Sequence, residues 1–208
     1  MIRFGGMLCF LGLVFVTLGA ASGNEPQTVA ESSGFTRTSR HEEVLDFCAK
    51  LAQRAPNRVR IAELGRSEEG RSIPLVILAD PPIADAAAAR ASRKPAVFVQ
   101  ANIHAGEVDG KEAVLMLARD LALSADAPLL KEWILLIAPD VNPDGNERMS
   151  NTNRRQQNGP TLVGTRGNSR GLDLNRDYVK LETAEVRALV RAYRDWNPAI
   201  VIDMHTTN

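Results

Sequence analysis

The sequence has little cysteine, no excess of either charge and no apolar run of comfortable transmembrane length. Two cysteines occur among 208 residues. Cys9 lies inside an apolar N-terminal segment, so Cys48 is the one cysteine left for the rest of the chain, and a single cysteine cannot form an internal disulfide. Lys and Arg together number 25, as do Asp and Glu. This balance argues against a nucleic-acid partner, which would favour a basic surface.

The first 22 residues have the composition of a secretory signal peptide. Arg3 precedes an apolar run from Met7 to Ala20, and small residues follow it. The run is shorter than the roughly 20 apolar residues that a membrane span needs. Because no small-residue lipobox precedes Cys9, a lipoprotein anchor is not expected. We predict an exported protein, periplasmic or secreted, without stable membrane association after signal cleavage, while an uncleaved anchor stays open.

The rest of the sequence predicts a single α/β domain. Residues 23–40 are small and polar, and we interpret them as a linker, whereas strand and helix patterns alternate along residues 41–208. We expect a mixed, largely parallel sheet that begins with an antiparallel hairpin and carries helices on both faces (α/β/α). The expected strands are 60–64, 73–78, 96–101, 133–138 and 199–203, and the expected helices are 42–54, one beginning near 107, and 183–196.

Three features have plain structural interpretations. Cys48 belongs to an apolar helical stripe, which predicts a buried thiol rather than a nucleophile. Residues 83–92 are rich in alanine and flanked by prolines, and we favour a solvated loop with at most one helical turn. His41 precedes the first predicted helix, where a solvated residue or a neighbour of the helix cap is expected.

The other two histidines stand where a metal site could form. His104 and Glu107 are three positions apart, a spacing that is weak by itself. His104, His205 and the turn at 142–145 each follow a predicted buried strand, however, and ligands bind beyond the carboxyl ends of strands in open α/β sheets. Two imidazoles and one carboxylate would hold zinc and leave a position for water.

Four short motifs surround these residues. They are NIHAGE at 102–107, NPDG at 142–145, GLDLNR at 171–176 and DMH at 203–205. In this order they resemble the zinc metallocarboxypeptidase family of the carboxypeptidase A type, from about residue 60 to the last residue. The resemblance implies the N-terminal portion of a catalytic domain that hydrolyses C-terminal peptide bonds by zinc-activated water.

The resemblance also implies the metal-binding residues. His104, Glu107 and His205 would bind one Zn²⁺ per chain. Asp173 matches the carboxylate that orients the first histidine and fixes its tautomer. Asp203 is either a similar partner of His205 or a solvated or capping residue.

Substrate contacts follow from the same resemblance. Asn175 and Arg176 match the pair that holds a terminal carboxylate, so the expected partner is a peptide with a free C-terminus. One of Arg154 and Arg155 matches the arginine that polarises the scissile carbonyl, and we lean to Arg155. Both lie in a basic stretch between Pro143 and Leu172, and guanidinium groups suit carboxylates well.

Two departures from the family are visible. Gly106 stands where the animal digestive members have an arginine, which leaves subsite preference open. No carboxylate follows His205, so we expect the general base beyond Asn208 and a sheet that is incomplete at the C-terminus. Because a general base contributes roughly 10² to 10⁴-fold, this chain alone is expected to be weak or inactive.

Two alternatives remain. One is a zinc amidohydrolase on the same scaffold, which would remove acyl groups from amino acids or trim cell-wall peptides. The other is a non-catalytic fragment that binds zinc or peptide.

Overall fold

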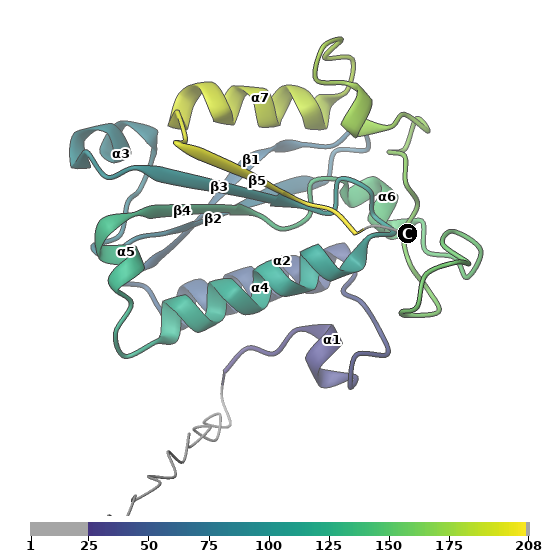
Figure 1. Ribbon diagram of the computed structural model, residues 1–208, viewed down its shortest axis with the longest axis horizontal. Coiled ribbons are helices and arrows are strands. Elements are labelled where there is room, and N and C mark those ends of the chain that lie inside the picture. Colours follow the sequence, from purple (N-terminus) through teal and green to yellow (C-terminus); the bar gives the residue numbers. More distant parts are fainter. Residues whose placement is uncertain (1–24, 207–208) are drawn as a thin grey trace, which may run out of the picture.

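A five-stranded mixed sheet forms the centre of the computed structural model, which describes residues 25–206 (Figure 1). The strand order is β1-β2-β4-β3-β5. β2 pairs antiparallel with β1 and β4, whereas β3 pairs parallel with β4 and β5, so β2 alone runs against the other four. The largely parallel sheet with an antiparallel start is therefore confirmed. The strands are β1 (Val59–Arg66), β2 (Ser72–Leu78), β3 (Ala96–Ala101), β4 (Ile134–Ala138) and β5 (Ile200–Met204).

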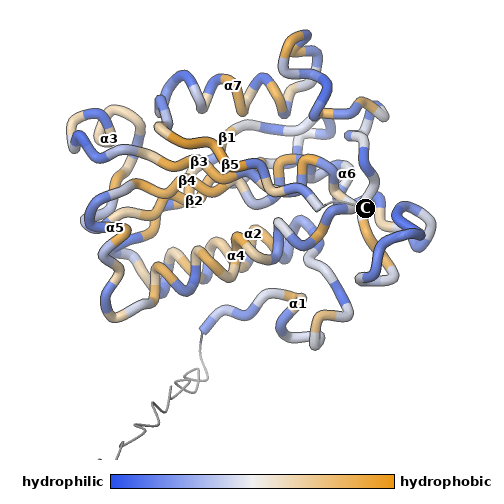
Figure 2. Tube along the Cα trace, in the orientation of Figure 1, coloured by the Kyte–Doolittle hydropathy of each residue, from blue (hydrophilic) through white to orange (hydrophobic). Residues whose placement is uncertain are grey.

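Helices cover both faces of this sheet, as expected (Figure 1). On one face lie α1 (Val29–Ser32), α2 (His41–Arg54), α4 (Val108–Leu123) and α5 (Pro128–Glu132), and on the other α3 (Ala86–Ser92) and α7 (Ala184–Trp196). Apolar residues concentrate in the sheet and on the helix sides that face it (Figure 2). Two core clusters result, one containing Leu51 and Leu115 and the other containing Phe98 and Leu189. Two short helices, α6 (Pro143–Glu147) and η1 (Leu174–Arg176), lie in the loops.

The segment before α2 is not the linker that we expected. Thr28 caps α1 by accepting a hydrogen bond from the Glu31 backbone N–H at 3.1 Å. Further along, Thr38 and Ser39 are buried, and both donate to the carboxylate of Glu112 in α4, at 2.8 Å and 2.7 Å. Residues 25–40 therefore pack on the domain, because their hydroxyl and backbone groups pair with a carboxylate buried in the domain.

A second local expectation was wrong, and a third was right only in part. Residues 86–92 form α3 rather than a loop, since Asp85 accepts from the Ala88 backbone N–H at 2.8 Å and caps the helix. His41 lies beside the helix cap, as one of its two interpretations had it, because it follows the N-cap residue Arg40 as the first residue of α2. It is buried rather than solvated, with its Nδ1 2.9 Å from Asp140 Oδ2. The prediction for Cys48 is confirmed: the thiol is buried, and that burial raises its pKa to about 12.

β5 departs from its sequence pattern. We expected a strand buried on both faces, but Ile200, Val201 and Ile202 are 47%, 48% and 41% exposed. Among the described residues, β5 lies at the edge of the sheet and pairs with β3 alone. The proposed signal peptide lies outside the described residues. Within residues 25–206, no helix combines the length and apolar character that crossing a bilayer requires.

Candidate metal centre

The parallel strands bring the motif residues to one edge of the sheet. β3 ends at Ala101 and β5 at Met204, so His104 and His205 both emerge at the carboxyl ends of paired parallel strands. Glu107 is the N-cap residue of α4, directly after the His104 turn. Gly110, in the first turn of α4, approaches the end of β5 so closely that a Cβ there would lie 2.7 Å from Met204 Cβ. This close approach brings Glu107 beside His205.

The three expected ligands converge. His104 Nδ1 lies 3.1 Å from Glu107 Oε1, and His205 Nδ1 lies 3.0 Å from Glu107 Oε2. One ligand atom from each residue can be chosen so that all three lie within 4.8 Å of one another. Two ligand atoms at tetrahedral positions, each about 2.0–2.1 Å from zinc, would be about 3.3 Å apart. The donor set and its spacing therefore fit one zinc ion.

Carboxylates hold the far nitrogen of each imidazole. His104 Nε2 lies 2.9 Å from Asp173 Oδ1, and His205 Nε2 lies 3.0 Å from Asp203 Oδ2. Such contacts fix the tautomer and ring orientation of a metal-binding histidine. Both rings therefore present Nδ1 toward Glu107. Asp203, for which the sequence left two interpretations open, lies against His205.

Electrostatics keep the central carboxylates ionised. Burial alone would raise the pKa of Glu107, but the Thr206 backbone N–H, His205, His104 and Arg154 outweigh it and lower that pKa. Burial likewise opposes a lowered pKa of Asp173, and the hydrogen bonds with His104 and Arg166 prevail. Metal ligands must be deprotonated, so the lowered pKa of Glu107 suits that role.

The structure brings Arg154, and not Arg155, to the ligands. Arg154 Nη2 donates to Glu107 Oε1 at 3.0 Å, and its side chain is 11% exposed. Arg155 is exposed. Gly106 makes room for the Arg154 stem, since a Cβ at that position would lie 2.6 Å from Arg154 Cγ and 2.9 Å from Gly164 O. The geometry therefore favours Arg154 over our preference for Arg155.

A second arginine, Arg166, also reaches the centre. Its Nε donates to Asp173 Oδ2 at 3.0 Å, and its Nη1 lies 3.9 Å from Glu107 Oε1. Arg166 belongs to the basic stretch between Pro143 and Leu172, and its sequence context indicated no individual role. The distance of Arg166 from the motifs along the sequence could not predict this contact, because its approach to Glu107 depends on the path of the loop.

Asn175 and Arg176 lie in η1, beside the two carboxylate-held histidines. The Asn175 backbone N–H donates to Asp173 Oδ1 at 3.0 Å, and its Nδ2 lies 3.5 Å from His205 Nε2. Arg176 is exposed, and its Nη1 donates to the backbone oxygen of Asn175 at 3.0 Å. Asn175 therefore contacts both Asp173 and His205, and the exposed Arg176 follows it in the chain.

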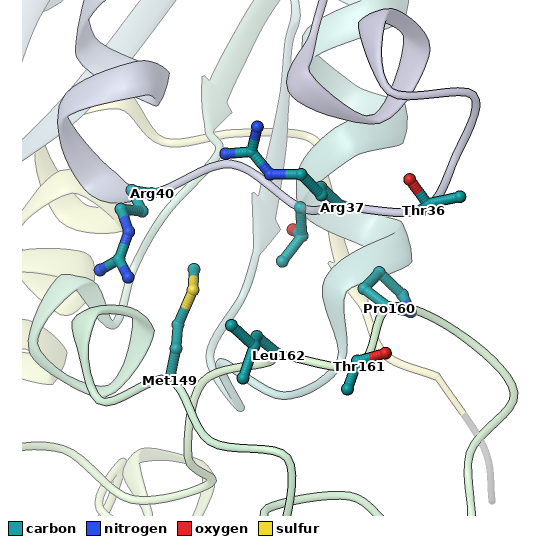
Figure 3. A pocket seen from close by; sticks show the side chains of 8 residues that line it. Thr36, Arg37, Arg40, Met149, Pro160, Thr161 and Leu162 are labelled. Atoms are coloured by element: carbon teal, nitrogen blue, oxygen red, sulfur yellow. The ribbon is translucent and has the colours of Figure 1, made fainter.

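A separate cavity of about 290 Å³ lies between the segment before α2 and the loop after α6 (Figure 3). None of the candidate metal ligands lines it, so it is distinct from the metal centre. Its lining residues are Thr36, Arg37, Thr38, Arg40, Met149, Pro160, Thr161 and Leu162.

Comparison with known proteins agrees with the geometry. The protein-family model described as "Zinc carboxypeptidase" matches residues 44–199. The chain belongs to the zinc carboxypeptidase family. Among its relatives, Carboxypeptidase 2 of Trichophyton rubrum is 30% identical over 185 residues, which cover 86% of this chain and 31% of that protein. Carboxypeptidase D of Drosophila melanogaster is 28% identical over 208 residues, which cover 93% of this chain and 14% of that protein.

Solved structures place this zinc carboxypeptidase chain in the same fold. The metallo-carboxypeptidase from Burkholderia cenocepacia is 26% identical with a TM-score of 0.62, over 80% of this chain and 41% of that one. Carboxypeptidase A from Helicoverpa armigera, 22% identical, matches the fold with a TM-score of 0.64 over 84% of this chain and 47% of that one. The chain thus spans about a third or less of these two sequence relatives and under half of these structures.

Proposed function

We propose that this chain is the metal-binding part of an exported zinc carboxypeptidase that removes C-terminal residues from peptides. The observation that carries the proposal is the convergence of His104 Nδ1, Glu107 and His205 Nδ1, with a carboxylate behind each imidazole. Family membership supports zinc over another metal at this donor set. The signal-like composition of residues 1–22 supports export.

Zinc, when bound, supplies a Lewis acid for a substrate carbonyl and lowers the pKa of water to about 7. The protein's part begins with Asp173 and Asp203, which orient the two imidazoles. Arg154 places a guanidinium 3.0 Å from Glu107 Oε1, next to the point where the ligands meet. A fixed cation there would stabilise the negative charge that develops on the carbonyl oxygen.

Asn175 and Arg176 would bind the terminal carboxylate of the peptide. The support is their position beside Asp173 and His205, together with the exposure of Arg176, which leaves its donors accessible. A guanidinium binds a carboxylate through two parallel hydrogen bonds. Glu107, Asp173 and Asp203 are already engaged with the histidines, so we propose that none of these three is the general base.

Metal analysis tests the core of the proposal. The purified chain should hold one zinc, and His104→Ala should hold almost none. Arg194→Ala is a control, because Arg194 lies in α7, its side chain is 75% exposed and it pairs with Asp195. Equal zinc content in the wild type and His104→Ala would overturn the ligand assignment.

Substrate profiling of the complete protein separates a carboxypeptidase from an amidohydrolase on the same scaffold. Hydrolysis that disappears when the peptide C-terminus is amidated supports the carboxypeptidase. Undiminished hydrolysis of amidated peptides, or release of acyl groups from amino acids, supports the amidohydrolase.

A further inference from the structure

A buried ammonium group lies one helical turn after the metal ligand Glu107. Lys111 is four positions along the chain, in α4, and is 0% exposed. Its Nζ donates to Asn146 Oδ1 at 2.7 Å and also to the backbone oxygen of Ser39. A buried charge is costly unless polar groups surround it, so these two acceptors and Lys111 depend on each other.

Asn146 links Lys111 to the turn that carries His104. Its Oδ1 also accepts from Asn102 Nδ2 at 3.1 Å, and Asn102 Nδ2 donates to Asp140 Oδ1 at 2.7 Å. All three of these polar residues are 0% exposed. Lys111, Asn146 and Asn102 thus form a continuous chain of hydrogen bonds that ends two residues before His104, and we call it the Lys111 chain.

Asn102 stands at the point where the backbone leaves β3. Its φ of 63° lies in the left-handed region, which non-glycine residues adopt infrequently. Asparagine tolerates this region better than most side chains, and the two Nδ2 bonds hold it there. Two residues later comes His104, so the backbone direction at Asn102 decides where that imidazole points.

The segment before α2 closes the other end of the Lys111 chain. Ser39 offers its backbone oxygen to Lys111 and donates its N–H to Glu112 Oε1 at 2.7 Å, and Thr38 donates its hydroxyl to the same oxygen at 2.8 Å. Glu112 follows Lys111 in α4 and is 4% exposed. Residues 38–39 are therefore fixed against α4 by both members of this buried charged pair.

We propose that the Lys111 chain positions the His104 turn for metal binding, so that zinc affinity depends on Lys111 and Asn102 although neither contacts the metal. The inference rests on the proposed zinc site. Residues that hydrogen-bond to metal ligands affect affinity by about 10 to 100-fold. The Lys111 chain acts one step further away, so we expect about a tenfold effect, at the low end of that range.

Asn102→Gly is the decisive variant. Glycine adopts the left-handed backbone without steric cost. Among residues 25–206, Asn102 Oδ1 accepts no hydrogen bond, so the change removes only the two Nδ2 bonds. Asn197→Gly is the matched control, since Asn197 also has a positive φ, 45°, but ends α7 at an exposed position. Leu115→Ala controls for stability, because it weakens the packing of α4 in the core and Leu115 takes no part in the Lys111 chain.

Zinc Kd is measured for the 208-residue chain by competition with a chromophoric chelator, far below the melting temperature of every variant. Asn102→Gly should bind zinc about tenfold more weakly. Lys111→Met should do the same, and the double variant should be no weaker than either single one, because both break one chain of bonds. Asn197→Gly and Leu115→Ala should keep the wild-type Kd.

Two outcomes would overturn the inference, and they are distinguishable. Wild-type zinc affinity in a folded Asn102→Gly, or an equal loss in Leu115→Ala, would show that the Lys111 chain supports the fold alone. If Lys111→Met fails to fold, Asn102→Gly still decides. A wild-type chain that binds no zinc, or binds it as well after His104→Ala, would overturn the proposed site itself.

Discussion

His104 and His205 approach the same carboxylate, but their surroundings differ. The His104 side chain is 3% exposed and follows β3, which is paired on both sides. The His205 side chain is 30% exposed and follows β5, which is paired with β3 alone. His104 is therefore held in a buried framework, whereas His205 follows a strand that, among the described residues, is paired on one side only.

The two oxygens of Glu107 show the same asymmetry. Oε1 faces His104 and Arg154, both buried or nearly so, while Oε2 faces His205 and the backbone N–H of Thr206. Oε1 is thus bound by side chains from two loops, the turn after β3 and the loop after α6, and Oε2 by residues just past the edge strand. The site thus has a buried half around His104 and a more exposed half around His205, just past β5.

The largest expected effect tests whether both halves supply a ligand. His104→Ala and His205→Ala should each weaken zinc binding by more than about 100-fold, beyond the range for residues that only support a ligand. Isothermal titration of zinc into the metal-free chain measures both. If His205→Ala lowers the zinc affinity by less than tenfold, His205 is not a ligand, and the centre has two ligands rather than three.

The carboxylates behind the imidazoles sharpen the comparison. Asp173→Ala should weaken zinc binding by about 10 to 100-fold, and Asp203→Ala should act near the lower limit. Asp173 also accepts from Arg166 and from the Asn175 backbone N–H, whereas the Asp203 contact lies on the exposed side of the site. The same titration measures both variants. A larger loss for Asp203→Ala would show that the His205 half depends more on its supporting carboxylate than the buried His104 half does.

Replacing Arg154 tests how much its ion pair with Glu107 stabilises the metal-free chain. In their ion pair, the side chains of Arg154 and Glu107 are 11% and 5% exposed, so removing the guanidinium leaves a buried carboxylate with fewer hydrogen-bond donors. Arg154→Ala should lower the free energy of unfolding of the metal-free chain by about 2 kcal/mol. Arg155→Ala, at an exposed position, should change it by less than about 0.5 kcal/mol. Urea unfolding compares the two, and equal effects would contradict the distinction.

The smallest expected effect is the pH dependence of the metal-free chain. The folded pKa of Glu107 is depressed below its usual 4.5, so its ionised form contributes stability above about pH 4.5. That contribution disappears as the pH falls through the folded pKa. Melting temperatures between pH 6 and pH 3 should fall less steeply for Glu107→Gln than for the wild type. Parallel curves would show that Glu107 is not held by its neighbours.

Local patterns in the sequence predicted most of the fold. Amphipathic and apolar runs located all five strands, and they located α2, α4 and α7, because side-chain periodicity reports which faces are buried. They did not predict α3 or α1, where short helices depend on the caps of Asp85 and Thr28. They predicted that β4 and β5 are both buried, which is confirmed for β4 and wrong for β5, because both are apolar runs and only the strand order distinguishes them.

By itself the sequence determined the candidate ligands, because His104, Glu107 and His205 are chemically suited to zinc and stand at strand ends. Tertiary structure alone decided that Arg154 rather than Arg155 reaches Glu107, that residues 38–39 join the domain, and that Lys111 supports the His104 turn. The physical reason is distance along the chain. Each of these contacts joins segments between 35 and 107 positions apart, as in Lys111 with Asn146 and Ser39 with Asn146. Such pairs form only once the whole sheet has set the positions of its loops.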